Sequence, residues 1–336
     1  MPVAVSPDEV ARAAAALRAG ELVAFPTETV YGLGADASSP VALARLYEVK
    51  GRPTDHPVIV HLADADALDD WAIDVPDAAR RLADAFWPGP LTLVLRRAPG
   101  VLDAVTGGQD TVGVRVPDQP VALALLRAFG GGVAAPSANR FGRVSPTTAA
   151  DVRADLGDDV DLVLDEGPCR VGVESTIVDC THEPFRIVRL GGVGRDELEA
   201  VAGRTVEDAR AVDGGADVVR VPGTLPSHYA PRARVVLEAH GELAARVAHE
   251  LSNGRRVGVI VPDPDWSAVD GAVVLGRPAD SEEFARTLYR MLRSADGHGL
   301  DVVIAVTPEE RGLGAAVADR LRRAAAPRPA DGADGT

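Results

Sequence analysis

Short apolar segments alternate with longer amphipathic or alanine-rich segments along most of this chain, and the links between them are short. The apolar segments are typical of buried strands, and the longer ones are typical of helices with recognisable start and stop residues. A helix at 7–19, for example, starts at Ser6-Pro7-Asp8-Glu9 and stops at Gly20. Alternating helices and strands with short connections are typical of an open, twisted α/β sheet with helices packed against it. The sequence therefore predicts an α/β fold.

The first part of the chain carries most of the predicted elements. Helices are expected at 7–19, 40–50, 78–86, 121–129 and 147–156, and strands at 22–25, 58–62, 91–95, 112–116 and 133–135. Three further strands, joined by turns, are expected between 162 and 190. A polar loop, 136–146, follows the strand at 133–135.

The composition changes after residue 191, where the chain becomes polar and rich in Asp, Gly and Arg. Three prolines then fall within 222–231, which predicts an extended and semi-rigid tether. Strands at 235–237, 257–261, 272–275 and 301–305 and helices at 242–251, 281–294 and 315–325 predict a small Rossmann-like β/α domain. We expect a first domain over 1–200, a linker over 201–232, a second domain over 233–326 and a disordered tail over 327–336.

The overall composition excludes several classes of protein. A net charge of −15 argues against a long nucleic-acid footprint, which needs many clustered cations, so an anionic ligand should be small, such as a nucleotide. Two cysteines, Cys169 and Cys180, are too few for a disulfide framework and lack metal-site spacing. No apolar run approaches the roughly 20 residues of a membrane span, and the N-terminus does not resemble a signal peptide. We expect a cytoplasmic protein with no membrane partner.

A single lysine, Lys50, stands among 35 basic residues, so the other 34 are arginine. A compact ammonium retained at one place favours a site where a point charge faces phosphate oxygens. The neighbouring sequence, Lys50-Gly51-Arg52-Pro53, adds a second cation beside a turn. The alternative is a lysine that survives by chance at an exposed helix end.

Two polar side chains interrupt apolar strands. His61 lies in 57–62 and is open to two interpretations, a ligand-binding residue or a core histidine with a satisfied hydrogen bond. Arg115 lies in the valine-rich 113–117 and needs an anionic partner or a water-filled cleft, since an unpaired buried charge is prohibitive. An Asp or Glu could supply that partner.

Other polar residues cluster in loops after strands, where α/β proteins bind ligands. The loop 26–34 offers Thr27, Thr29 and Tyr31 with glycines, although a plain turn fits it equally well. Asn139, one of only two asparagines, ends a Pro-Ser-Ala-Asn turn, and Ser145 could cap the following helix or bind an anion there. The chain has no Walker loop, no Gly-x-Ser-x-Gly elbow and no His-Glu-x-x-His.

Taken in order, these segments resemble the threonylcarbamoyl-AMP synthase family, whose catalytic domain is of the YrdC type. The matching strings are PTETVYGLG (26–34), KGRP (50–53), PVIVHL (57–62), WPGPLTLVL (87–95), TVGVRVPD (111–118), PSAN (136–139), ESTIVD (174–179) and IVRLGG (187–192). The tether and the second domain are similar to the longer, two-domain branch of the family. The resemblance implies a YrdC-like open sheet in the first domain.

The resemblance also implies the reaction. ATP, L-threonine and bicarbonate would give L-threonylcarbamoyl-AMP and pyrophosphate, with Mg²⁺ accompanying ATP and no all-protein metal site. Downstream proteins would then transfer the threonylcarbamoyl group to an adenosine of certain tRNAs, so little or no stable binding of tRNA to this chain is expected. Three bound anions make positioning and cations the main demands on such a site.

By motif match, the resemblance assigns roles to individual residues. Lys50 and Arg52 would be catalytic, neutralising the triphosphate together with Arg189. The remaining ATP-binding residues would be His56, Thr111, Ser137, Asn139, Ser145 and Tyr229, the last acting as a lid from the tether. The threonine-binding residues would be Thr29, His61, Arg115, Ala135 and Ser175, with Arg115 clamping the carboxylate.

Two other functions compete with this one. A carbamoyl transferase is related, because YrdC-type domains also occur in hydrogenase maturation and antibiotic carbamoylation, although two cysteines exclude the zinc modules of the former. An RNA-binding regulatory protein would use the concave basic surface of such folds. The net charge and the scarcity of aromatic residues weigh against it.

Overall fold

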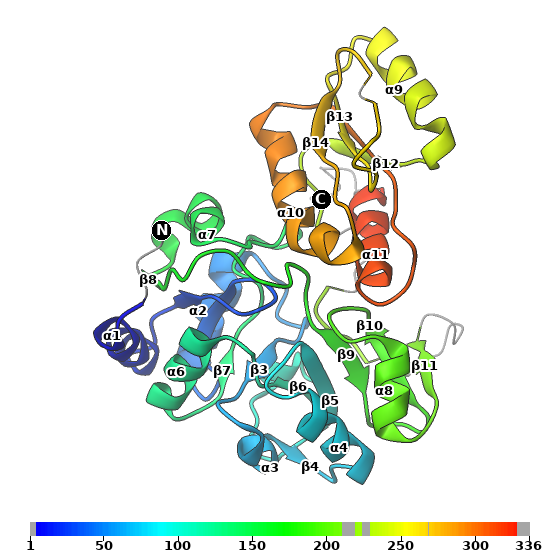
Figure 1. The fold of residues 1–336 in the computed structure, drawn as a ribbon. Coiled ribbons are helices and arrows are strands. Elements are labelled where there is room, and N and C mark those ends of the chain that lie inside the picture. Colours follow the sequence, from blue (N-terminus) through cyan, green and yellow to red (C-terminus); the bar gives the residue numbers. More distant parts are fainter. Residues whose placement is uncertain (1–4, 210–218, 224–228, 268, 328–336) are drawn as a thin grey trace, which may run out of the picture.

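A computed structural model describes residues 5–209, 219–223, 229–267 and 269–327 (Figure 1). The first unit contains, in order, α1 (Pro7–Arg18), β1 (Val23–Phe25), β2 (Gly32–Asp36), α2 (Pro40–Lys50), β3 (Ile59–His61), α3 (Leu68–Trp71), β4 (Ala72–Ile73), α4 (Asp77–Phe86), β5 (Leu91–Arg97), α5 (Asp103–Thr106), β6 (Thr111–Arg115), α6 (Pro120–Phe129), β7 (Val133–Ala134), α7 (Ala149–Leu156), β8 (Leu162–Val163), β9 (Thr176–Asp179), β10 (Phe185–Arg189), α8 (Arg195–Ala202) and β11 (Val206–Asp208). The second unit contains β12 (Arg234–Leu237), α9 (Leu243–Ser252), β13 (Val257–Ile260), β14 (Val273–Gly276), α10 (Ser281–Gly297), β15 (Val302–Ala305) and α11 (Leu313–Ala325).

Local sequence signals set the limits of the helix that carries the lysine. The Ser39 side chain accepts from the Ala42 backbone N–H, and Pro40 occupies the first helical position of α2. Gly51 ends the helix in the left-handed conformation, with φ of 61°, which glycine adopts without steric cost. Lys50 is therefore fixed as the last residue of α2.

The strands of the first unit form one mixed sheet. Within the described residues it has eleven strands in the order β11-β10-β9-β5-β6-β3-β7-β2-β1-β8, with β4 paired to β5 at the side. β3 pairs parallel with β6, which places His61 opposite Arg115 in the register. The sheet thereby brings together two polar residues that lie 54 positions apart in the sequence.

Helices cover the two faces of this sheet unevenly. α1 and α6 pack together on one face, and α2, α4, α7 and α8 share the core on the other. Val60 belongs to the core that α2, α4, α7 and α8 share. Its neighbours in β3, Ile59 and His61, therefore point to the opposite face of the sheet, the one on which α1 and α6 pack. There Ile59 is packed against Val221 from the tether and not against a helix. This face is where a ligand can approach the sheet.

The second unit is a parallel sheet in the order β12-β15-β13-β14, with helices between and after its strands. This confirms the predicted small Rossmann-like β/α fold, and the mixed first sheet confirms the predicted α/β class. In Figure 1 the helices α10 and α11 face the first unit. No helix in the described ranges is both long and apolar enough to cross a membrane.

The structure differs from the predicted elements in a few places. β2 lies where the sequence suggested only a loop, and α3, β4 and α5 were not predicted. α8 extends to Ala202 and β11 pairs in parallel with β10, so the start of the predicted linker, 201–208, is part of the first unit. The predicted lid segment 224–228 and the predicted tail from 328 onward lie outside the described residues.

Candidate functional site

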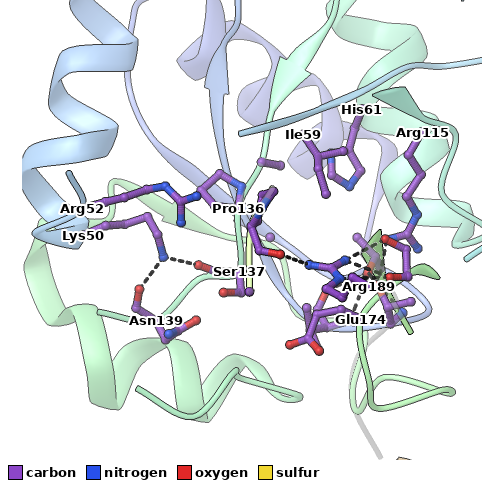
Figure 2. A pocket seen from close by; sticks show the side chains of 18 of the residues that line it. Lys50, Arg52, Ile59, His61, Arg115, Pro136, Ser137, Asn139, Glu174 and Arg189 are labelled. Atoms are coloured by element: carbon purple, nitrogen blue, oxygen red, sulfur yellow. Dashed lines mark hydrogen bonds between the residues drawn. The ribbon is translucent and has the colours of Figure 1, made fainter. Parts of the chain in front are cut away.

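A pocket lies on the open face of the first sheet (Figure 2). Pro222, Gly223 and Tyr229 of the tether also line it. Eleven of the fourteen residues predicted for the site line it: Thr29, Lys50, Arg52, His61, Arg115, Ala135, Ser137, Asn139, Ser175, Arg189 and Tyr229. They come from strand ends, from the end of α2 and from the loop after β7. The fold therefore gathers most of the predicted residues around one cavity.

Lys50 lies buried at one end of the pocket, only 2% exposed. Its Nζ donates to the backbone carbonyls of Ser137 and Asn139, each at 2.5 Å. Burial, reinforced by the charge of Arg52, lowers the pKa of Lys50 well below its ordinary value. The interpretation of Lys50 as an exposed helix end is therefore wrong.

Arg52 and Arg189 are two further buried cations of the pocket. The Arg52 guanidinium donates to the carbonyls of Pro57 at 2.7 Å and His56 at 3.2 Å. Arg189 donates to the Ser175 carbonyl at 2.9 and 3.1 Å and to the Pro222 carbonyl of the tether at 2.9 Å. Burial lowers the pKa of both groups.

These three cations, Lys50, Arg52 and Arg189, share one property. Within the part of the chain that the structure describes, none of them forms an ion pair with a carboxylate: their hydrogen bonds go to backbone carbonyls and, for Arg189, also to the Ser175 hydroxyl at 3.0 Å. Glu174 interacts with Arg189 only at longer range. Buried charges in proteins are normally paired, because desolvation without a counter-charge is costly. Three cations of this kind around one cavity define a site for a polyanion.

Arg115 lies across the pocket from Lys50 and Arg52, on the side where Arg189 also lies, and is held differently (Figure 2). Its Nη2 pairs with Glu28 Oε1 at 2.5 Å, its Nη1 donates to Thr29 Oγ1 at 3.0 Å, and its Nε donates to the Gly89 carbonyl at 3.1 Å. The anionic partner that the sequence required is therefore Glu28. These contacts use three of the five guanidinium N–H donors and leave two for a ligand.

Three buried polar atoms at this site have no hydrogen-bond partner among the described residues. They are Glu28 Oε2, His61 Nδ1 and Asn139 Oδ1. Burial, followed by the charge of Arg115, lowers the pKa of His61 to about 3, so its ring is neutral at physiological pH. Because buried polar atoms are rarely left unsatisfied, the two that belong to pocket-lining residues, on His61 and Asn139, are positions that a ligand could complete.

Three predicted residues do not line the pocket. His56 packs its ring edge-to-face against Phe141, with centroids 5.4 Å apart, and Phe141 lines the pocket. Thr111 lies in a neighbouring hollow that shares Ile59 and Pro222 with the pocket. Ser145 donates to Glu174 Oε1 at 2.7 Å, and so reaches the pocket only through that carboxylate.

The sequence interpretation assigned no role to two acidic residues that the structure places at the site. Glu28 pairs with Arg115, and Glu174 lines the pocket while remaining 6% exposed. Both lie in segments that match the family, Glu28 in 26–34 and Glu174 in 174–179. The signal that could have identified an acidic site residue was the need of a buried arginine for a carboxylate partner. Tyr289 and Arg320, which contact Glu174 from the second unit, carried no such local signal.

The fold and the pocket together define a two-unit α/β protein whose pocket contains three buried cations beside a separately paired arginine, Arg115. A family model described as telomere recombination, of the Sua5, YciO and YrdC proteins, matches residues 15–191, and one described as the C-terminal domain of threonylcarbamoyl-AMP synthase matches 193–326. The chain therefore belongs to the threonylcarbamoyl-AMP synthase family of nucleotidyl-transferring enzymes, in its two-domain form.

Individual relatives agree with this assignment. The threonylcarbamoyl-AMP synthase of Pyrococcus abyssi is 42% identical over 318 residues, covering 93% of this chain and 92% of that protein. The threonylcarbamoyl-AMP synthase of Bacillus subtilis is 42% identical over 322 residues, covering 94% and 93%. The crystal structure of P. abyssi Sua5 complexed with L-threonine superimposes with a TM-score of 0.89 and 41% identity, over 96% of each chain.

Proposed function

We propose that this protein makes L-threonylcarbamoyl-AMP and pyrophosphate from ATP, L-threonine and bicarbonate. The observation that carries the proposal is the set of three buried cations without a carboxylate partner, Lys50, Arg52 and Arg189. A triphosphate supplies the missing negative charge. The close relatives named as threonylcarbamoyl-AMP synthases support the choice of this reaction over other nucleotide chemistry.

The reaction needs two bond-forming steps. The threonine amine and bicarbonate combine to a carbamate with loss of water. A carbamate oxygen then attacks the α-phosphorus of ATP, the bond to the β-phosphate oxygen breaks, and pyrophosphate leaves. Since both reactants are anionic, the protein must hold them together against their repulsion and stabilise the charge that passes to pyrophosphate.

The two sides of the pocket suit these two reactants. Lys50, Arg52 and Arg189 would face the phosphates, and the neighbouring Ser137 and Asn139 would hydrogen-bond the nucleotide. On the other side, the two free N–H donors of Arg115 would bind the threonine carboxylate. The remaining predicted residues there, Thr29, His61, Ala135 and Ser175, would bind the hydroxyl and amine.

Glu28 adds a role that the sequence did not suggest. Its Oε1 pairs with Arg115, so Glu28, which is not among the described residues that line the pocket, would act on threonine through that guanidinium. A carboxylate at this position holds the guanidinium plane in one orientation, which a bidentate carboxylate clamp requires.

The Mg²⁺ that accompanies ATP would depend little on protein carboxylates. Among the described residues that line the pocket, Glu174 is the only acidic one, and both of its oxygens already accept hydrogen bonds. No group of three potential metal ligands occurs in the residues that the structure describes. The ion would therefore be held by phosphate oxygens and water, as is usual for Mg²⁺ with nucleotides.

The product would be consumed by other proteins. A mixed anhydride with AMP is a reactive acyl-type donor, and the proposed sequel is transfer of the threonylcarbamoyl group to an adenosine of tRNA by separate proteins. A net charge of −15 fits a chain that makes the donor and does not itself bind tRNA stably.

Pyrophosphate release from ATP, with and without L-threonine and bicarbonate, tests the proposal. We expect release only with both co-substrates, and loss of release in Lys50→Ala. Arg45→Ala is the matched control, because it removes a cation from the same helix at a side chain 36% exposed that pairs with Asp161. Release driven by carbamoyl phosphate instead would support a carbamoyl transferase, and no release at all would contradict the proposal.

A further inference from the structure

The second unit contacts the pocket through one buried carboxylate. Glu174 Oε1 accepts from Ser145 Oγ at 2.7 Å, and Oε2 accepts from Arg320 Nε at 2.8 Å. The hydroxyl of Tyr289 lies 2.9 and 2.8 Å from the two carboxylate oxygens. Tyr289 belongs to α10 and Arg320 to α11, so two of the three partners come from the second unit. We call Glu174, Tyr289 and Arg320 the inter-unit latch.

The latch is charged, buried and tightly bonded. Arg320 is fully buried, and it also pairs with Asp319 at 2.6 Å and donates to the Leu190 carbonyl at 2.8 Å. Burial alone would raise the pKa of Glu174, but Arg320 and Arg189 outweigh it and lower that pKa to about 2. The carboxylate is therefore ionised throughout the working range of pH, and the latch keeps its geometry there.

The same two side chains also hold the tether. Tyr229 is 1% exposed and lines the pocket. Its ring stacks on that of Tyr289, with centroids 5.6 Å apart and an interplanar angle of 23°. The guanidinium of Arg320 also lies over the Tyr229 ring, 5.1 Å from its centroid.

Tyr229 needs such support because of its backbone. Its φ is 63°, in the left-handed region, which a bulky residue adopts only where its surroundings hold it there. Ring stacking from Tyr289 and the cation of Arg320 supply that restraint, and Glu174 fixes both of those side chains in turn. The contacts thus form a chain from the second unit to the wall of the pocket.

We infer that Tyr289 and Arg320 are positioning residues for the nucleotide site, which they serve by holding Tyr229 against the pocket through the latch. The inference rests on the proposed function, and it gives the second unit a specific task in it. Neither side chain touches the reactants; both act through Tyr229. Removal of the latch should weaken nucleotide binding while leaving the threonine side unchanged, because Arg115 is held separately by Glu28.

A purely structural interface is the rival interpretation, and the molecule offers a control for it. Arg293 of α10 pairs with Asp155 of α7 at 2.7 Å, which joins the same two units without contacting Tyr229. Asp155→Asn removes that ion pair at constant side-chain size. If any loosening between the units impaired the enzyme, Asp155→Asn would act like a latch variant.

The variants are chosen so that a loss of nucleotide binding is not caused by misfolding. Arg320→Ala would strand the buried Glu174 charge and is avoided for that reason. Tyr289→Phe keeps the ring stack and removes only the hydroxyl, whereas Tyr289→Leu removes both the hydroxyl and the stack. Each is combined with Tyr229→Leu in a double-mutant cycle, read out by the Kd of a fluorescent ATP analogue and by kcat/KM for ATP.

We expect Tyr289→Phe to raise the Kd of the analogue about tenfold, because it loses the hydrogen bond to a charged group, and Tyr289→Leu to raise it further, because it also loses the ring stack. Both should leave KM for threonine within about threefold. Asp155→Asn should not raise the Kd of the analogue, because the carboxylate that it removes is an anion that interacts with Lys50 on the phosphate side. In the Tyr229→Leu background Tyr289→Leu should have little further effect. Additive effects of the two substitutions, or equal effects of Asp155→Asn, would overturn the inference.

The binding readout keeps this inference separate from the proposed function. Wild-type protein that binds the analogue but releases no pyrophosphate with threonine and bicarbonate would contradict the proposed reaction. The double-mutant cycle in Kd would still support or overturn the role of the latch in that case.

Discussion

Replacing Lys50 with methionine removes the only ammonium of the chain and keeps a side chain of similar length. In the structure Nζ lies 2.5 Å from the Ser137 and Asn139 carbonyls, at the end of the pocket where Arg52 also lies. ATP would exchange at least one of these backbone contacts for a phosphate oxygen. Lys50→Met therefore removes a charged donor from the triphosphate while leaving the threonine side intact.

The expected size of the effect follows from that single interaction. A hydrogen bond that involves a charged group contributes about 1.5–3 kcal/mol, which corresponds to a loss of about 10- to 150-fold in kcat/KM for ATP. KM for threonine should change by less than about threefold, because Glu28 and not Lys50 holds Arg115. Thermal stability should change little, since the lost hydrogen bonds are offset by the removal of a buried charge.

Pyrophosphate release at varied ATP, with threonine and bicarbonate saturating, measures the effect, and thermal unfolding shows whether the variant is folded. Lys50→Arg is the informative companion, because a planar guanidinium cannot replace a point donor seated between two carbonyls. We expect it to recover little activity. A folded Lys50→Met that keeps kcat/KM for ATP within about threefold of wild type would refute the reasoning, and full activity of Lys50→Arg would refute the point-charge argument.

Three further predictions concern the neutral histidine, the lysine and the choice of amino acid. Because the folded pKa of His61 is about 3 and the unfolded value is 6.5, its contribution to stability is complete above pH 6.5 and is lost as pH falls toward 3. The free energy of unfolding lost in this way reaches about 2 kcal/mol at pH 5. His61→Gln should therefore flatten the decline in the free energy of urea unfolding between pH 7.5 and 5.0, and an unchanged decline would contradict this. Selective ¹⁵N-lysine labelling should give one side-chain amine signal, from Lys50. Burial should lower the pKa of this amine below 10.5, and a pKa of 10.5 or above would exclude the buried position. In competition assays, valine should be rejected by roughly 10⁴-fold relative to threonine, and serine by only about 10–200-fold. Equal turnover of valine and threonine would contradict the assignment of the hydroxyl-binding residues.

Much of the fold was predictable from local sequence because its helices have strong boundaries. α2 begins at the predicted Pro40 and ends at Lys50, where Ser39 and Gly51 supply both caps. β2 was missed since its Gly-Leu-Gly start is typical of a turn. The structure shows why glycine stands in that strand: a Cβ at Gly34 would lie 2.9 Å from both the Phe25 ring and Val133. This close packing is a tertiary constraint, which no local pattern reveals.

The site was predictable to the extent that its residues stand at the ends of strands. His61 and Arg115 were recognisable as polar residues in apolar strands, but the parallel register that places them side by side depends on the strand order of the sheet, which the local sequence does not determine. The partners of Glu174 were not predictable. Tyr289 and Arg320 lie 115 and 146 positions away in helices with ordinary amphipathic patterns, and only the packing of the two units brings them together.

Glu174 also limits how such a gene can change. Among the described residues, the second unit supplies two of the three side chains that bind this carboxylate and also helps to bury it, so a premature stop before α10 would remove both contacts and expose Glu174 to water. Water can then hydrate the carboxylate, but the ring stack and the guanidinium that hold Tyr229 would be lost with the second unit. A chimaera that joins this first unit to a foreign second unit should therefore work only if the incoming unit brings its own tyrosine and arginine to this position.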